Sequence, residues 1–130
     1  MSAGIAIGVG CRLGCSADAI EVLVRQALDR APASKRLGLF TIIDKSGEPG
    51  LIEAAGRLGL DLVLLPREAL QEQAAFVQTP SARTASRFGV PAVAEAAALA
   101  GAGAGSVLIV PRIASRDATC AVAEAGYNPP

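Results

Sequence analysis

The sequence predicts a single three-layer α/β/α domain over residues 1–130, with a mostly parallel sheet and a possible antiparallel edge strand. Three observations lead to this fold class. Short apolar runs without charge alternate with longer segments of helical periodicity. Proline and glycine residues separate the two kinds of segment. The length of 130 residues is enough for one hydrophobic core but not comfortably for two, and no linker or internal repeat is visible.

The first half of the chain reads as three strand–helix units. Ser16 is a good N-cap for the first helix, and Pro32 ends that helix. Pro49 suits the first turn of the second helix, which ends at Gly59, and Pro66 opens the third. The β-α-β-α-β-α order predicts parallel strands with right-handed crossovers. The strands are expected at residues 4–9, 37–43 and 62–65, and the helices at 16–31, 49–59 and 66–73.

The second half is less regular. Thr79-Pro80-Ser81 predicts a cap followed by a short helix that stops at Gly89. An alanine-rich helix is expected from residue 91 to about 100, and an apolar strand at 106–110 is followed directly by Arg112. Residues 118–125 are ambiguous between strand and helix. Thr119 and Val122 favour a last strand at the edge of the sheet.

Composition excludes several classes of function. The formal net charge is zero, and the twelve basic residues are scattered, which argues against a nucleic-acid surface. The chain contains no histidine, so it cannot form a Ser-His-Asp triad, a Cys-His pair or a histidine-ligated metal site. Three cysteines are too few for a structural zinc site, which takes about four ligands. We therefore expect no metal and no cofactor.

The cysteines and the longest apolar stretch indicate the compartment. An odd number of cysteines without a secretory segment in front of them favours reduced thiols in the cytoplasm. Buried thiols are the commoner outcome, although Cys15 at a helix N-terminus could have a lowered pKa. Residues 91–111 carry a single charge but are interrupted by glycines, so we expect a soluble protein rather than a membrane span.

A glycine-rich stretch between the first strand and the first helix is the leading candidate for a binding site. Backbone N–H groups at the N-terminus of a helix can bind an anion, and Arg12 adds a positive charge there. The spacing G-x-G-x-x-x-G is a weak variant of the dinucleotide fingerprint, and the chain is short for a complete dinucleotide fold. The plainer interpretation is a tight strand-to-helix turn. The residues in question are Gly8, Gly10, Cys11, Arg12, Gly14 and Ser16.

Further polar residues are expected at the same edge of the sheet, because ligands of open α/β sheets bind beyond the carboxyl ends of the strands. Asp44, Lys45 and Glu48 follow the second strand, and Arg112 follows a later one. Thr79 and Ser81 could add hydroxyl groups to the same crevice. Solvated turns and a simple helix cap are the alternatives.

Three carboxylates have more than one interpretation. Asp44 and Glu48 are weak candidates for a catalytic base, since the chain has no histidine for that role. Glu95 lies in the otherwise apolar alanine-rich helix. We expect it to face water, with pairing to a basic residue of the crevice as the alternative.

The order of these motifs resembles the C-terminal domain family of CbiG, a cobalamin biosynthesis protein, over nearly the whole chain. No single motif decides the resemblance, but five in the same order are fairly specific. The motifs are Gly8-x-Gly10-Cys11-Arg12-x-Gly14, Thr41-Ile42-x-Asp44-Lys45 with Glu48-Pro49-Gly50-Leu51, Thr79-Pro80-Ser81, Gly89-Val90-Pro91-x-Val93-Ala94-Glu95, and Ala118-Thr119-Cys120-Ala121-Val122.

The resemblance implies a role in building the corrin ring, and the domain standing alone suggests the aerobic pathway. It implies a protein that binds a corrinoid or precorrin intermediate as a carrier or accessory factor. The alternatives are a hydrolase that opens a precorrin lactone, as CbiG does, or a non-catalytic partner of another pathway enzyme. An exposed apolar patch on the alanine-rich helix would favour that partner role. Corrinoid precursors carry many carboxylates, which suits Arg12, Lys45, Arg112 and the helix N-termini.

Overall fold

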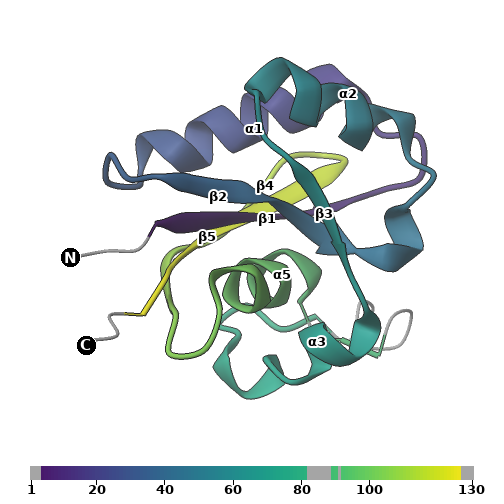
Figure 1. Ribbon diagram of the computed structural model, residues 1–130. Coiled ribbons are helices and arrows are strands. Elements are labelled where there is room, and N and C mark those ends of the chain that lie inside the picture. The colour runs from purple at the N-terminus through teal and green to yellow at the C-terminus, as the bar shows by residue number, and fades with distance from the viewer. Residues whose placement is uncertain (1–3, 82–88, 91, 127–130) are drawn as a thin grey trace.

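The computed structural model describes residues 4–81, 89–90 and 92–126, and it contains a five-stranded sheet with helices on both faces (Figure 1). The strands are β1 (Ile5–Cys11), β2 (Arg36–Ile42), β3 (Leu62–Leu65), β4 (Val107–Ala114) and β5 (Ala118–Glu124). The helices are α1 (Ala17–Asp29), α2 (Pro49–Leu58), α3 (Arg67–Gln71) and α5 (Val93–Ala102), with 3-10 turns η1 (Ile43–Lys45) and η2 (Ala74–Phe76). Helices α1 and α2 cover one face, and α3 and α5 cover the other. The predicted three-layer α/β/α class is confirmed.

The strand order is β3-β2-β1-β5-β4, with β1, β2 and β3 parallel. Strand β5 runs antiparallel to both β1 and β4, so the antiparallel strand is real but its predicted position at the edge is wrong. The hairpin that joins β4 to β5 places β5 beside β1 and leaves β4 at the edge. Burial agrees with this position, because residues 120–123 of β5 are all buried, as expected for a central strand.

Strand β1 lies at the centre of the molecule and packs on both faces, as its uncharged sequence predicts. Ile5, Ile7 and Val9 join the apolar cluster under α1 and α2. Ala6 and Gly8 face the other way, toward α5. This alternation follows from the two-residue period of a strand.

The predicted helix boundaries agree closely with the structure. The Ser16 Oγ accepts a hydrogen bond from the Ala19 N–H at 3.1 Å and so caps α1. Pro49 occupies the first turn of α2, and Gly59 ends that helix with a left-handed φ of 67°. The short helix predicted between Ser81 and Gly89 falls at residues 82–88, outside the described residues.

Helix α5 is the central element of the second face. It packs on β1, β2 and β5, and its residues from Val93 to Leu99 are buried. The alanine-rich helix therefore does not offer the exposed apolar patch that docking on another enzyme would need. Within the described residues, none of the helices is both long and apolar enough to cross a membrane.

Candidate functional site

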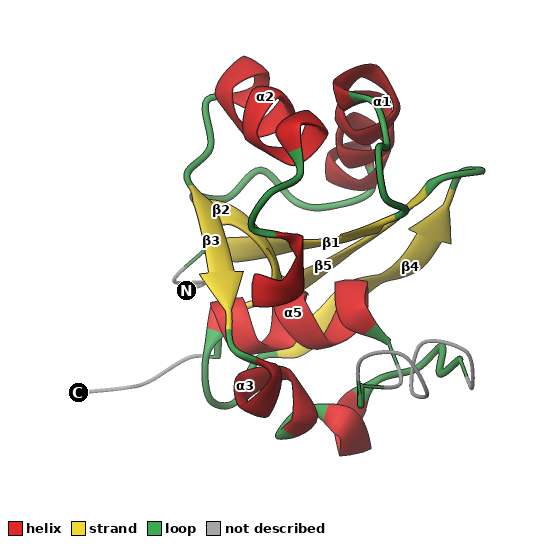
Figure 2. Cartoon of the chain, turned by 90° about the vertical axis from the view of Figure 1, so that its right-hand side faces the viewer, coloured by secondary structure: helices red, strands yellow, loops and turns green. Residues whose placement is uncertain are grey.

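The polar candidates lie in the segments that follow β1 and β2, in the second half of β4 and before α5, toward the carboxyl edge of the sheet. Figure 2 shows how these elements are arranged, with α5 on the opposite face of the sheet from α1 and α2. Because β5 is antiparallel, its first residues lie at this edge too. The Arg12 N–H donates to the Asp117 carbonyl at 2.8 Å, which joins the β1–α1 loop to the β4–β5 turn. The Thr119 Oγ1 donates to the Gly10 carbonyl at 3.4 Å. The β1–α1 loop and the β4–β5 turn are therefore directly joined at this edge.

The first glycine of the loop has a packing role. Gly8 is buried within β1, and a Cβ there would lie 2.0 Å from the Ala94 carbonyl oxygen of α5. A Cβ on Gly10 would lie 2.7 Å from the Thr119 Oγ1. These two glycines thus allow α5 and β5 to approach β1 closely. Gly14 has a positive φ of 77° and open space around it, so it serves the turn itself.

The backbone of the same loop already has a carboxylate partner. Glu48 is buried, and its Oε2 accepts the Gly14 N–H at 3.0 Å. Ser16 uses its hydroxyl to cap α1. The protein's own groups therefore occupy the N–H donors of Gly14 and Ala19, where the sequence predicted a bound anion.

Two cysteines and a buried lysine lie around the same loop. Burial, partly offset by Lys45, raises the pKa of the Cys11 thiol to about 11. Burial also raises the pKa of the Cys15 thiol, and the negative charges of Asp117 and Glu48 add to this effect. The change is opposite to the lowering that a helix N-terminus alone would cause.

The third cysteine, Cys120, is buried in β5, and burial raises the pKa of its thiol to about 12. All three thiols are therefore protonated at neutral pH, and none is an activated nucleophile. Within residues 4–81, 89–90 and 92–126, no group of His, Cys, Asp or Glu side chains could hold a metal ion.

Asp44, the first candidate base, is held by an arginine after β3. The Arg67 Nε donates to the Asp44 Oδ1 at 3.0 Å, and the Arg67 Nη2 donates to the other carboxylate oxygen. The hydrogen bonds from Arg67 hold the pKa of Asp44 below its ordinary value. This two-point pair stabilises the ionised carboxylate and makes it a weaker base.

The predicted environment of Glu95 is wrong. Its side chain is 0% exposed, although we expected it to face water. Its Oε1 accepts the N–H groups of Gln78 and Thr79, both at 2.8 Å. Its Oε2 accepts the Thr79 hydroxyl at 2.8 Å and the Arg112 N–H at 3.0 Å. Among the residues that the structure describes, its partners are backbone and hydroxyl donors rather than a basic side chain.

Burial by itself would raise the pKa of Glu95. The hydrogen bonds from Arg112, Thr79 and Gln78 outweigh it and hold the pKa of this carboxyl below its ordinary value. A single charge in an otherwise buried apolar helix, three residues into its first turn, was the signal in the sequence. A carboxylate at that place is stabilised by the helix N-terminus.

The Arg112 N–H can bind a group outside the sheet because β4 is irregular at this point. Val110 pairs with Val122 and Ile113 pairs with Cys120, so β4 has one residue more than β5 between these pairs. Pro111, inside this bulge, has no N–H to give, and the Arg112 N–H turns to Glu95. Bulges of this kind redirect side chains and occur next to functional sites. Thr79 and Arg112, two predicted site residues, are thus brought together by Glu95.

A model of the family described as "Cobalamin synthesis G C-terminus" matches residues 5–123. The chain belongs to this family. It is 34% identical over 123 residues to the protein CobE of Sinorhizobium sp, which is 93% of this chain and 80% of that protein. The crystal structure of a CobE from the cobalamin (vitamin B12) biosynthetic pathway superposes with a TM-score of 0.82 at 32% identity, covering 92% of this chain and 89% of that one. The chain is a cobalamin biosynthesis protein.

The chain is also similar to the cobalt-precorrin-5A hydrolase of Priestia megaterium. The two are 32% identical over 126 residues, which is 95% of this chain but 33% of the hydrolase. The chain thus spans one third of that enzyme. The resemblance to this family that the sequence indicated is confirmed.

In this member of the family, the carboxyl edge carries exposed arginines. Arg12 and Arg112 are exposed, and so is Arg116 in the β4–β5 turn. Within the described residues, none of these three forms an ion pair with a carboxylate, in contrast to Arg25, Arg57 and Arg67. Lys45 is buried, and Ser81 is half-buried at the end of a described segment.

Two large apolar side chains also protrude at this edge. Leu13, beside Arg12, is 83% exposed, and Ile43 in η1 is 49% exposed. The Gly14 N–H binds Glu48, and this hydrogen bond links the loop that contains Leu13 to the segment that follows Ile43 and η1. The edge therefore combines exposed cations with exposed apolar surface.

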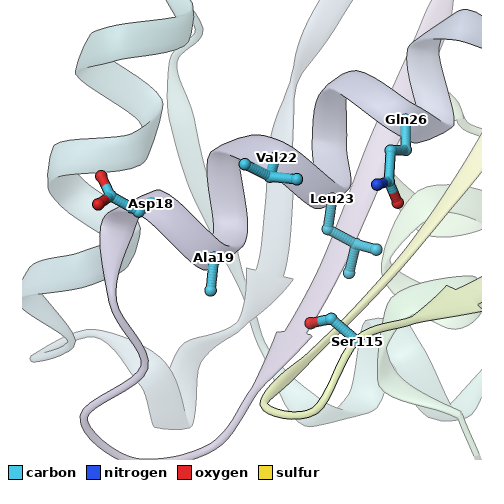
Figure 3. A pocket seen from close by; sticks show the side chains of 6 residues that line it. All are labelled: Asp18, Ala19, Val22, Leu23, Gln26 and Ser115. Carbon is cyan, nitrogen blue, oxygen red and sulfur yellow. The ribbon is translucent and has the colours of Figure 1, made fainter.

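Two recesses are lined by other residues. One is a pocket of about 300 Å³ between α1 and the β4–β5 turn (Figure 3), lined by Asp18, Ala19, Val22, Leu23, Gln26 and Ser115. Its one charged residue is an aspartate that pairs with Arg57. The other, of about 620 Å³, surrounds the α1–β2 loop at the opposite edge of the sheet and includes Lys35 and Arg36. Neither contains a predicted site residue.

Proposed function

We propose that this protein binds a corrinoid intermediate of cobalamin biosynthesis as a carrier or accessory factor, at the carboxyl edge of its sheet. The observation that carries the proposal is the pair Arg12 and Arg112, exposed and without carboxylate partners within the described part of the chain. Corrinoid intermediates carry several acetate and propionate groups, which suit arginine donors. Their flat macrocycle suits exposed apolar side chains such as Leu13 and Ile43.

Binding is favoured over catalysis by what the other polar groups do. Asp44 is in a two-point pair with Arg67, and Glu48 accepts the Gly14 N–H. The thiols are protonated, and the chain has no histidine. The three free cysteines also support the expectation of a reducing compartment, the cytoplasm.

The test is a titration of the protein with hydrogenobyrinic acid, followed by visible absorption. We expect Arg12→Ala and Arg112→Ala each to raise the Kd about five- to tenfold, the size expected for one charge-assisted contact. Arg30→Ala removes the same charge from the C-cap of α1, at the opposite edge, and should bind as the wild type does. An unchanged spectrum with the wild-type protein, or equal losses in all three variants, would contradict the proposal.

The second candidate is hydrolysis of a precorrin lactone, favoured by the similarity to the hydrolase. Asp44 or Glu48 would then activate water, after release from Arg67 or Gly14. Product analysis after incubation with a lactone-bearing precorrin tests this function. Full turnover in both Asp44→Asn and Glu48→Gln would exclude these carboxylates as the base, and absence of product from the wild type would leave binding alone.

A further inference from the structure

We propose that Glu95 is the positioning residue of the corrinoid site, where its buried carboxylate holds Thr79 and Arg112 in one arrangement. The proposal rests on the proposed function. Glu95 does not touch a ligand itself, because its side chain is fully buried. Its role is exerted through the two segments that it joins.

Within the described part of the chain, the Glu95 carboxylate accepts four hydrogen bonds. A carboxylate offers about four acceptor positions. Two are taken by the N–H groups of Gln78 and Thr79, one by the Thr79 hydroxyl and one by the Arg112 N–H. A carboxylate engaged in this way determines where these described donors stand.

The two segments are far apart in sequence. Thr79 precedes Glu95 by 16 residues, and Arg112 follows it by 17. One side chain in the first turn of α5 therefore links the loop before the helix to the strand after it. The bulge in β4 supplies the N–H that makes this link possible, since a regular ladder would use it within the sheet.

A purely structural need would be met more simply. The helix around Glu95 is built from buried alanines, and a small apolar residue would pack there without the cost of burying a charge. A carboxylate at this place gives what an alanine cannot, which is a defined position for Arg112 relative to Thr79. Preorganised binding groups raise affinity because the ligand need not order them.

The test is a double-mutant cycle on the Kd for hydrogenobyrinic acid. In Glu95→Gln, an amide N–H₂ replaces one oxygen and faces groups that are themselves donors. We expect the variant to bind about tenfold more weakly. Arg112→Ala, which weakens the wild type, should then cost less than about threefold in the Glu95→Gln background, because Arg112 is no longer held in place.

Arg12 supplies the internal control. Its N–H is held by the Asp117 carbonyl and not by Glu95, so Arg12→Ala should cost the same factor in both backgrounds. Ser106→Ala removes the hydroxyl that donates to the Leu99 carbonyl at the other end of α5, and it should leave the Kd unchanged. A general loosening of the fold would instead reduce the effects of Arg12 and Arg112 alike.

The outcomes separate the two proposals. If the wild type does not bind the probe, the proposed function fails and this role fails with it. Wild-type affinity in Glu95→Gln, or additive effects of Glu95→Gln and Arg112→Ala, would overturn the positioning role alone. Should Glu95→Gln not fold, Thr79→Val removes one of the four donors with little change of shape, and the same coupling to Arg112 is expected in smaller measure.

Discussion

At the scale of single residues, the glycines of the first loop show how one motif can serve packing and shape rather than a ligand. A Cβ on Gly8 would lie 2.0 Å from the Ala94 carbonyl oxygen and 2.6 Å from the Ala98 nitrogen. Both are backbone atoms of α5, and they cannot move aside as a side chain could. The spacing of glycines along the sequence is the same for either use, so the motif alone could not separate them.

The stability of the protein should depend on this contact between β1 and α5. Gly8→Ala should lower the free energy of unfolding by about 2–3 kcal/mol or more, because α5 must shift away from β1. Gly56→Ala is the matched control, since Gly56 lies in α2 with open space where a Cβ would be. That variant should gain about 0.5–1 kcal/mol in urea denaturation from the better helix propensity of alanine. Equal stabilities of the two variants would refute the packing role of Gly8.

The wrong prediction for Glu95 also has its cause at this scale. Hydrophobic periodicity assigns a charged residue to the solvent face of a helix. Helix α5 has no such face from Val93 to Leu99, because the segment around Gln78 covers what would otherwise be open. Contacts between residues 16 and 17 positions apart leave no periodic trace in the sequence.

At the scale of elements, the attachment of α5 to its neighbours should depend on pH. The pKa of Glu95 is lowered in the folded state, so its ionised form contributes stability above the ordinary value of 4.5. That contribution is lost as the pH falls from about 4.5 through the lower folded-state pKa. Urea denaturation between neutral pH and about pH 3 should therefore show a steeper acid loss in the wild type than in Glu95→Gln.

The control for this pH dependence is Glu53→Gln, which removes an exposed carboxylate from α2. Its acid loss should follow that of the wild type, because exposed ion pairs contribute little. Asp44 also has a lowered pKa, but it is common to all three proteins and cancels in the comparison. Identical profiles for the wild type and Glu95→Gln would contradict the prediction.

Elements whose signals are local could be read from the sequence. Ser16, Pro49 and Gly59 set helix boundaries through their own backbone and side-chain chemistry, and all three act as predicted. The position of β5 depends instead on which strands it pairs with, and pairing partners are distant in the chain. Its run of small buried residues was consistent with a strand covered on both faces, but the hairpin with β4 decided its place.

At the scale of the whole molecule, the carboxyl edge was the part of the site that the sequence could predict. Strand direction alone brings the segments after β1, β2 and β4 together. The sequence could not show which polar groups there are already engaged. Asp44 and Glu48 are satisfied within the protein, whereas Arg12 and Arg112 project without ion-pair partners in the described segments. The proposed site is thus defined by the charges that have no ion-pair partner in the described segments.

This distribution of charge leads to the last prediction. The formal net charge is zero, so among the described residues we expect the local arginines Arg12, Arg112 and Arg116 to attract a polycarboxylate. Exposed charges are screened over about 8–10 Å at ordinary salt concentrations. We expect the Kd for hydrogenobyrinic acid to rise at least severalfold between low salt and about 0.5 M NaCl.

Two controls test whether this salt dependence comes from the arginines. The Arg12→Ala, Arg112→Ala double variant should show a clearly smaller salt dependence, because two of these three arginines are gone. A corrinoid whose carboxylates are converted to amides should bind the wild type more weakly and with little salt dependence, since only its macrocycle can contact Leu13 and Ile43. Equal affinity for the acid and the amide would mean that apolar contact, rather than arginine recognition of carboxylates, holds the ligand at this edge.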